Sequence, residues 1–112
     1  MIRHCSLWKF HDDVSDDLVD EITREIYAAV AEIPYVRNAA CGRNIGYLPA
    51  NYNLAMNLDF DDLDGYRAYV AHDRHMALYR QYLEPHTESR VAVQFDLGPQ
   101  SSDTVQGTPS TI

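Results

Sequence analysis

Positive charge is scarce in this 112-residue chain, which has nine lysine and arginine residues against seventeen aspartate and glutamate residues. The formal net charge is −8. A surface of that sign repels phosphate backbones and anionic lipid headgroups, so nucleic-acid and membrane partners are not expected. The chain also lacks an apolar run of membrane-spanning length, and Met1 to Phe10 is too short and too polar for a signal peptide.

Cysteine is scarce too, because Cys5 and Cys41 are the two in the chain and form no Cys-x-x-Cys pair. A zinc or redox motif is therefore not predicted, and we expect two buried free thiols in a reduced, cytoplasmic protein. Three histidines, His4, His72 and His75, are the candidate metal ligands. Without a HExxH motif or a nearby carboxylate pair, we predict no metal and no cofactor.

Hydrophobic periodicity predicts the element order β-α-β-β-α-β. Strands are expected at residues 2–10, 36–45, 52–60 and 89–97. The first helix is expected between an N-cap at Ser15 and Pro34. The second helix should begin at Asp61 or Asp62, falter at residues 72–74 and stop at Pro85.

This order is typical of the ferredoxin-like fold of the α+β class, with helices covering one face of an antiparallel sheet. The face expected to meet the helices carries Tyr52, Leu54, Met56, Val91, Val93 and Phe95. The face expected to pack on a second copy, which would close a barrel, carries Asn53, Ala55, Asn57, Arg90, Ala92 and Gln94. Residues 1–97 are predicted to form the domain and residues 98–112 a polar tail.

Several segments in this order resemble one family. They are Arg3 to Phe10, Ile33 to Val36, Gly42 to Asn44, Tyr52 to Phe60, and Tyr69-x-x-His72-x-x-His75. Together they resemble the stress-responsive dimeric α/β-barrel (Dabb) family from about Ile2 to Leu97. The resemblance implies a dimeric α+β barrel, with a homodimer formed through the sheet face.

The family includes plant polyketide cyclases of the olivetolic acid cyclase type, which close a ring by aldol chemistry without a cofactor. Their base histidine matches His75, their partner tyrosine matches Tyr69, and a pocket histidine matches His4. Leu54 stands where they have a further pocket histidine, and Asp73 stands where the family often has proline. The resemblance implies a cofactor-independent cyclase, a lyase or isomerase, acting on a polyketide-like, carbonyl-rich substrate.

His75 is the candidate base because imidazole titrates near neutral pH, and Tyr69 is the candidate donor to an enolate oxygen. They share no face of a regular helix, so the two converge only if the helix breaks between them. The alternative for His75 is a core histidine bonded to a backbone carbonyl. The candidate substrate-binding residues are His4, Trp8, Tyr52, Leu54, Met56, His72 and Phe95.

Other interpretations stay open for these residues and for the whole chain. His72 could cap a helix end, and His4 could bond a core neighbour. Arg43 and Arg74 could receive a carboxylate or phosphate, or lie on the solvated surface. The protein could be a non-catalytic stress-response or ligand-binding barrel, or a cofactor-free monooxygenase like the related antibiotic-biosynthesis enzymes, because fold alone does not fix function.

Overall fold

The computed structural model describes residues 1–98 of the chain, so residues 99–112 of the predicted tail lie outside the described part. The main elements, in chain order, are β1 (Ile2–Phe10), α1 (Asp16–Ala31), β2 (Asn38–Arg43), β3 (Leu54–Phe60), α2 (Leu63–Ala71), α3 (Asp73–Leu78) and β4 (Thr87–Asp96). A π-helical turn (η1, Tyr79–Leu83) and a 3-10 turn (η2, Glu84–His86) join α3 to β4.

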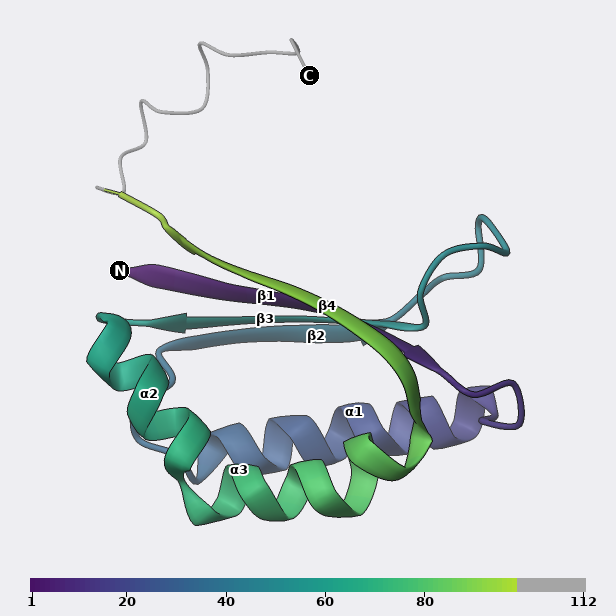
Figure 1. Ribbon diagram of the computed structural model, residues 1–112, viewed down its shortest axis with the longest axis horizontal. Coiled ribbons are helices and arrows are strands. Elements are labelled where there is room, and N and C mark those ends of the chain that lie inside the picture. The colour runs from purple at the N-terminus through teal and green to yellow at the C-terminus, as the bar shows by residue number, and fades with distance from the viewer. Residues whose placement is uncertain (99–112) are drawn as a thin grey trace, which may run out of the picture.

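The strands form one four-stranded antiparallel sheet in the order β2-β3-β1-β4. All three α-helices lie on one side of this sheet (Figure 1). This is the ferredoxin-like α+β fold, as the element order predicts. The loop 44–53 between β2 and β3 extends away from the helices. Within residues 1–98, no helix combines the length and apolar character that crossing a bilayer requires.

The helix starts follow the capping residues in the sequence. Ser15 accepts a hydrogen bond from the Leu18 backbone N–H at 3.1 Å, and Asp62 accepts one from Gly65 at 2.9 Å. Short polar side chains satisfy backbone donors that have no partner inside the helix. The second and third strands are shorter than the periodicity indicates, because β2 begins at Asn38 and β3 begins at Leu54.

The core lies between the helices and the face of the sheet that they cover. Alternate residues of the two central strands are buried there, namely His4, Ser6, Trp8 and Phe10 of β1 with Leu54, Met56, Leu58 and Phe60 of β3. The apolar stripe of α1 packs against them through Val19, Ile22, Ile26 and Ala29. Burial of this apolar area is the main force that fixes the helices on the sheet.

The prediction for the faces of the last strand was wrong. In the β1–β4 register, Gln94 lies opposite His4 and Arg90 lies opposite Trp8, so both point to the helix side. Val91, Val93 and Phe95 lie on the other side, with 51%, 55% and 43% of their surface exposed. Strand alternation separates the two faces but does not say which one is inside, and both faces of β4 carry apolar atoms.

The uncovered side of the sheet carries an apolar patch, which we call the open face and define by Cys5, Leu7, Val91, Val93 and Phe95. These side chains come from the paired strands β1 and β4. Leu7 is 40% exposed, and Cys5 is half-buried. Arg90 and Gln94, which the periodicity placed on this side, are absent from it. The open face is therefore more apolar than the sequence indicates.

Candidate functional site

A hollow of about 310 Å³ lies between the sheet and the helical segment from α2 to η1. Its lining is mainly aromatic and apolar, with two imidazoles and one guanidinium: His4, Trp8, Met56, Tyr66, Tyr69, Val70, His75, Met76, Tyr79, Leu83 and Arg90. The π-helical turn supplies two of these residues, and such turns often occur at functional sites. We call this hollow the helix–sheet cavity.

His75 and Tyr69 converge because the helix breaks between them. His72 ends α2 with an extended backbone (φ −70°, ψ 137°), and α3 starts at Asp73. The break brings the Tyr69 and His75 rings to a centroid separation of 4.5 Å. Both rings line the helix–sheet cavity. The two rings therefore converge, as a base and a donor acting on one molecule must.

His75 is held as a neutral imidazole with one nitrogen tied to the backbone. Its Nδ1 lies 3.0 Å from the Val70 carbonyl oxygen. A carbonyl only accepts, so the Nδ1 of the neutral ring carries the proton and Nε2 keeps its lone pair. Burial lowers the pKa of His75 below its usual 6.5; the bond to Val70 opposes this shift, and the charge of Arg90 adds to it. A purely structural histidine would make the same hydrogen bond to a backbone carbonyl. Because this bond uses only Nδ1, the Nε2 atom of His75 remains available.

Tyr69 is a buried phenol that keeps its proton. It is 4% exposed, and burial raises its pKa well above the usual 10. Within residues 1–98 its hydroxyl has no hydrogen-bond partner, so the proton can be donated to a bound molecule. Phe60 and Tyr66 hold the ring in place, with centroid separations of 5.3 Å and 6.3 Å.

His4 is a second neutral imidazole in the same cavity. Its Nδ1 accepts a hydrogen bond from Nε2 of Gln94 at 2.8 Å, so the ring proton resides on Nε2. Burial, reinforced by Arg90 and His75, lowers its pKa from 6.5 to about 4. The two imidazoles therefore have opposite tautomers: His75 keeps a free lone pair, and His4 keeps an N–H donor.

Four other candidate residues do not line the helix–sheet cavity. Phe95 lies on the open face, because the facing of β4 was predicted in reverse. His72 caps α3, accepting the Arg74 backbone N–H on Nδ1 at 3.0 Å rather than capping carbonyls. Leu54 is buried in the core, and the Tyr52 hydroxyl accepts from Ser89 at 3.1 Å.

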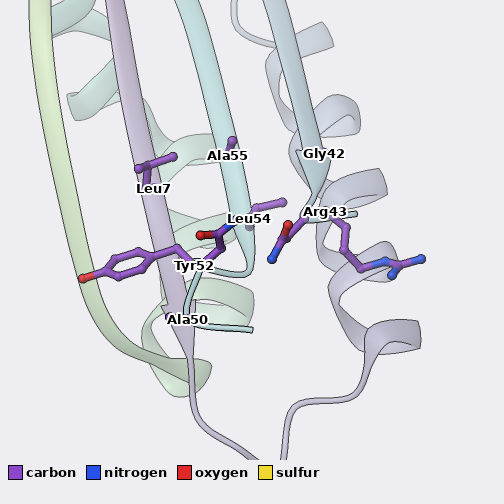
Figure 2. Close-up of a pocket in the computed structure, with 9 residues that line it drawn as sticks. Leu7, Gly42, Arg43, Ala50, Tyr52, Leu54 and Ala55 are labelled. Atoms are coloured by element: carbon purple, nitrogen blue, oxygen red, sulfur yellow. The ribbon is translucent and has the colours of Figure 1, made fainter. Parts of the chain in front are cut away.

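Tyr52 and Leu54 instead line a second hollow of about 450 Å³ beside the loop 44–53. It opens on the uncovered side of the sheet, where Leu7, Ala55 and Gly42 are cross-strand neighbours. In Figure 2 the Arg43 side chain extends away from Tyr52 and Leu7. Its guanidinium pairs with Asp16 and Asp20. This hollow is larger but holds no pair of groups suited to proton transfer.

The sequence reasoning missed Arg90, which was assigned to the opposite face. Its guanidinium carbon lies 5.0 Å from the centroid of the Trp8 ring, and its side chain lines the helix–sheet cavity. Arg74, a candidate for anion binding, is instead paired with Glu25 and Glu32. No local sequence signal could have located Arg90, because its face is set by the β1–β4 register, which places it opposite Trp8.

No three His, Cys, Asp or Glu side chains in residues 1–98 lie close enough together to hold a metal ion. His72 in particular uses its ring in the cap of α3. The three histidines weighed as metal ligands do not form such a group. What the cavity offers instead is a neutral base, neutral hydrogen-bond donors and, at the exposed residue Arg90, one permanent positive charge beside a largely apolar lining.

Comparisons with known proteins agree with the fold. The family model of the stress responsive A/B barrel domain matches residues 2–97. A dimeric ferredoxin-like protein of unknown function from Thermobifida fusca is 38% identical, with a TM-score of 0.78 over 86% of this chain and 90% of that chain. A protein of Streptomyces coelicolor is 33% identical over 87 residues, 73% of this chain and 90% of that protein.

A hydroxynitrile lyase from Passiflora edulis has a TM-score of 0.72 at 13% identity, covering 84% of this chain and 90% of its own, which is a likeness of fold alone. The family match spans both the sheet and the helical segment that encloses the cavity. The chain therefore belongs to the stress-responsive A/B barrel (Dabb) family.

Proposed function

We propose that this protein is a cofactor-independent enzyme that removes a proton from a carbonyl-rich, polyketide-like substrate and promotes aldol-type cyclisation or isomerisation. The observation that carries the proposal is the pairing of the His75 and Tyr69 rings, whose centroids lie 4.5 Å apart beside the helix–sheet cavity that both line. A general base needs a lone pair and a pKa near or below the working pH, and His75 has both.

The reaction begins when Nε2 of His75 takes a proton from a carbon between two carbonyl groups. The electron pair of that C–H bond moves into one carbonyl, whose oxygen becomes the enolate oxygen and accepts a hydrogen bond from Tyr69. In a cyclisation, the enolate carbon then attacks a second carbonyl carbon of the same molecule. The new alkoxide takes the proton back from His75. A preorganised donor in a largely apolar pocket stabilises developing charge better than water does.

The remaining lining gives the cavity its shape and a second donor. His4 presents Nε2–H, which suits a carbonyl oxygen of the substrate. Trp8, Met56 and Tyr66 supply a flat, largely apolar wall that suits an extended or ring-forming carbon chain. A cavity of about 310 Å³ is at the lower end of the range for small-molecule sites.

We also propose that two copies associate through the open face. Leu7, Val91 and Val93 form an exposed apolar stripe along paired strands, and such stripes mark association sites. The loop 44–53 extends on the same side of the sheet (Figure 1). Two of its residues, Ile45 and Tyr47, are 91% and 81% exposed. The relative from Thermobifida fusca is described as dimeric, which supports this assembly. The helix–sheet cavity lies on the far side of the sheet, so each protomer would keep its own.

The test is the exchange of deuterium from heavy water into the carbon between the two carbonyls of a 3-oxoacyl thioester, followed by proton NMR. The thioester should take up deuterium faster with the wild-type protein than in buffer alone. His75→Gln should lose about a hundredfold or more of that rate, and Tyr69→Phe about tenfold to a hundredfold. The control is His11→Gln, since His11 is an exposed histidine outside the cavity.

Three outcomes would count against this function. Equal exchange rates in wild type and both cavity variants would remove His75 and Tyr69 from the chemistry. Saturable binding of the thioester with no exchange above buffer would instead favour the non-catalytic, ligand-binding alternative. Uptake of oxygen with an anthrone-type substrate would favour the monooxygenase.

A further inference from the structure

Arg90 stands apart from most arginines of the described chain. Arg3, Arg37, Arg43, Arg67 and Arg74 each pair with an aspartate or glutamate. Arg90 has no acidic partner within residues 1–98, and its one described contact is with the Trp8 ring. Unlike Arg24 and Arg80, which also lack a described acidic partner, it lines a cavity.

The charge inside the helix–sheet cavity is opposite to that of the chain. The chain has a net charge of −8, yet no carboxylate lines this cavity. Arg90 is its one permanent charge, since His4 and His75 are held neutral by burial. The charge of Arg90 acts on both of these imidazoles and on the Tyr69 phenol, which places it within electrostatic range of the proposed proton transfer.

We propose that Arg90 is the specificity-determining residue of the helix–sheet cavity, and that the ligand it selects carries a carboxylate. The guanidinium presents a planar set of donors that matches a carboxylate with two hydrogen bonds. Trp8 lies against the guanidinium at 5.0 Å and limits its orientations without consuming its hydrogen bonds. A single cation with no second positive group suits a monoanion better than a phosphate.

The substrate class then becomes narrower than the proposed function requires. This substrate assignment rests on the proposed function, because it names the kind of molecule on which His75 would act. That molecule is an anionic, carbonyl-containing acid rather than a neutral ketone. Arg90 would bind the carboxylate at the β4 edge. The carbon chain would then extend along the aromatic wall toward Tyr69 and His75.

The chain contains a built-in probe for this site. Trp8 is its one tryptophan and contacts Arg90, so ligand binding beside the guanidinium should change the intrinsic fluorescence. We would titrate the full-length protein with benzoate, with benzamide as the neutral molecule of the same shape, and with phenyl phosphate. The variants are Arg90→Gln and Arg90→Lys. The matched control is Arg80→Gln, which removes the same charge from an exposed site outside the cavity.

Wild type and the Arg80→Gln control should bind benzoate more tightly than benzamide. Arg90→Gln should lower the benzoate affinity about tenfold to a hundredfold, which is the usual contribution of one charge-assisted contact. The benzamide affinity should stay unchanged. Arg90→Lys should recover part of the benzoate affinity. Equal benzoate binding in wild type and Arg90→Gln, or no saturable binding by wild type, would overturn the proposal. Tighter binding of phenyl phosphate than of benzoate would overturn the carboxylate assignment.

The two proposals fail in different ways. Benzoate binding that depends on Arg90, together with no deuterium exchange on any carbonyl substrate, would refute the enzymatic function and support the role of Arg90. Exchange that is lost in His75→Gln, together with an unchanged KM of Arg90→Gln for carboxylate substrates, would support the enzymatic function and refute the role of Arg90.

Discussion

His4 should make this protein sensitive to mild acid, and a single substitution should remove much of that sensitivity. The imidazole is 3% exposed, accepts a hydrogen bond from Gln94 and has its pKa lowered from 6.5 to about 4. In the unfolded chain it takes up a proton as the pH falls through about 6.5. In the folded chain it does so only near 4. Between these values the unfolded state binds more protons, so stability falls as the pH falls.

The magnitude follows from the two pKa values. Each unit of difference corresponds to about 1.4 kcal/mol, so the full effect is about 3 kcal/mol. Between about pH 7 and about pH 4.5, His4 alone should lower the free energy of unfolding by about 2 kcal/mol. The carboxylate of Asp59 contributes at lower pH, because Arg3 holds its pKa below the usual 3.8.

The assay is urea unfolding at these two pH values and one protein concentration, for wild type and His4→Gln. Glutamine can still receive the Gln94 amide but cannot take up a proton. Between the two pH values, the free energy of unfolding of His4→Gln should change by about 2 kcal/mol less than that of the wild type. His11→Gln, at an exposed site, should behave as the wild type does. An equal loss of stability in wild type and His4→Gln would refute the reasoning.

Three further predictions concern the helix break, the open face and the base. His72→Ala removes the ring that accepts the Arg74 N–H at 3.0 Å, so it should lower the unfolding free energy by about 1 kcal/mol in urea titrations, and no loss would argue against the cap. Val93→Glu puts a charge on the open face and should shift the mass in light scattering from dimer to monomer; an unchanged mass would exclude this interface. Deuterium exchange should stay constant near neutral pH and fall on the acid side of the His75 pKa, below 6.5, whereas a fall that begins above 6.5 would point to another base.

The last strand shows where sequence reasoning stops. Alternation places Val91, Val93 and Phe95 on one face correctly, but the inside face is decided by the register with β1. That register places Gln94 beside His4, a pairing 90 residues apart that no local pattern reports. The apolar residues on the open face led to the wrong prediction, because an uncovered face with exposed Val91, Val93 and Phe95 resembles a core in composition.

The candidate site was predictable in part for a related reason. The break between Tyr69 and His75 is local, and the interrupted apolar pattern at residues 72–74 indicated it. His4, Trp8 and Met56 follow from strand alternation on β1 and β3. The position of Arg90 depends on tertiary pairing alone, and its lack of a carboxylate partner within residues 1–98 becomes visible only when the chain is folded.

The central claim is that His75 keeps an unprotonated Nε2 open to the helix–sheet cavity beside the Tyr69 hydroxyl. Long-range proton–nitrogen NMR of ¹⁵N-labelled protein, followed through a pH titration, measures this directly. We predict a neutral ring protonated on Nδ1, with a pKa below 6.5, whose Nε2 signal shifts when benzoate is added. A ring protonated on Nε2, or a pKa at or above 6.5, would contradict the account.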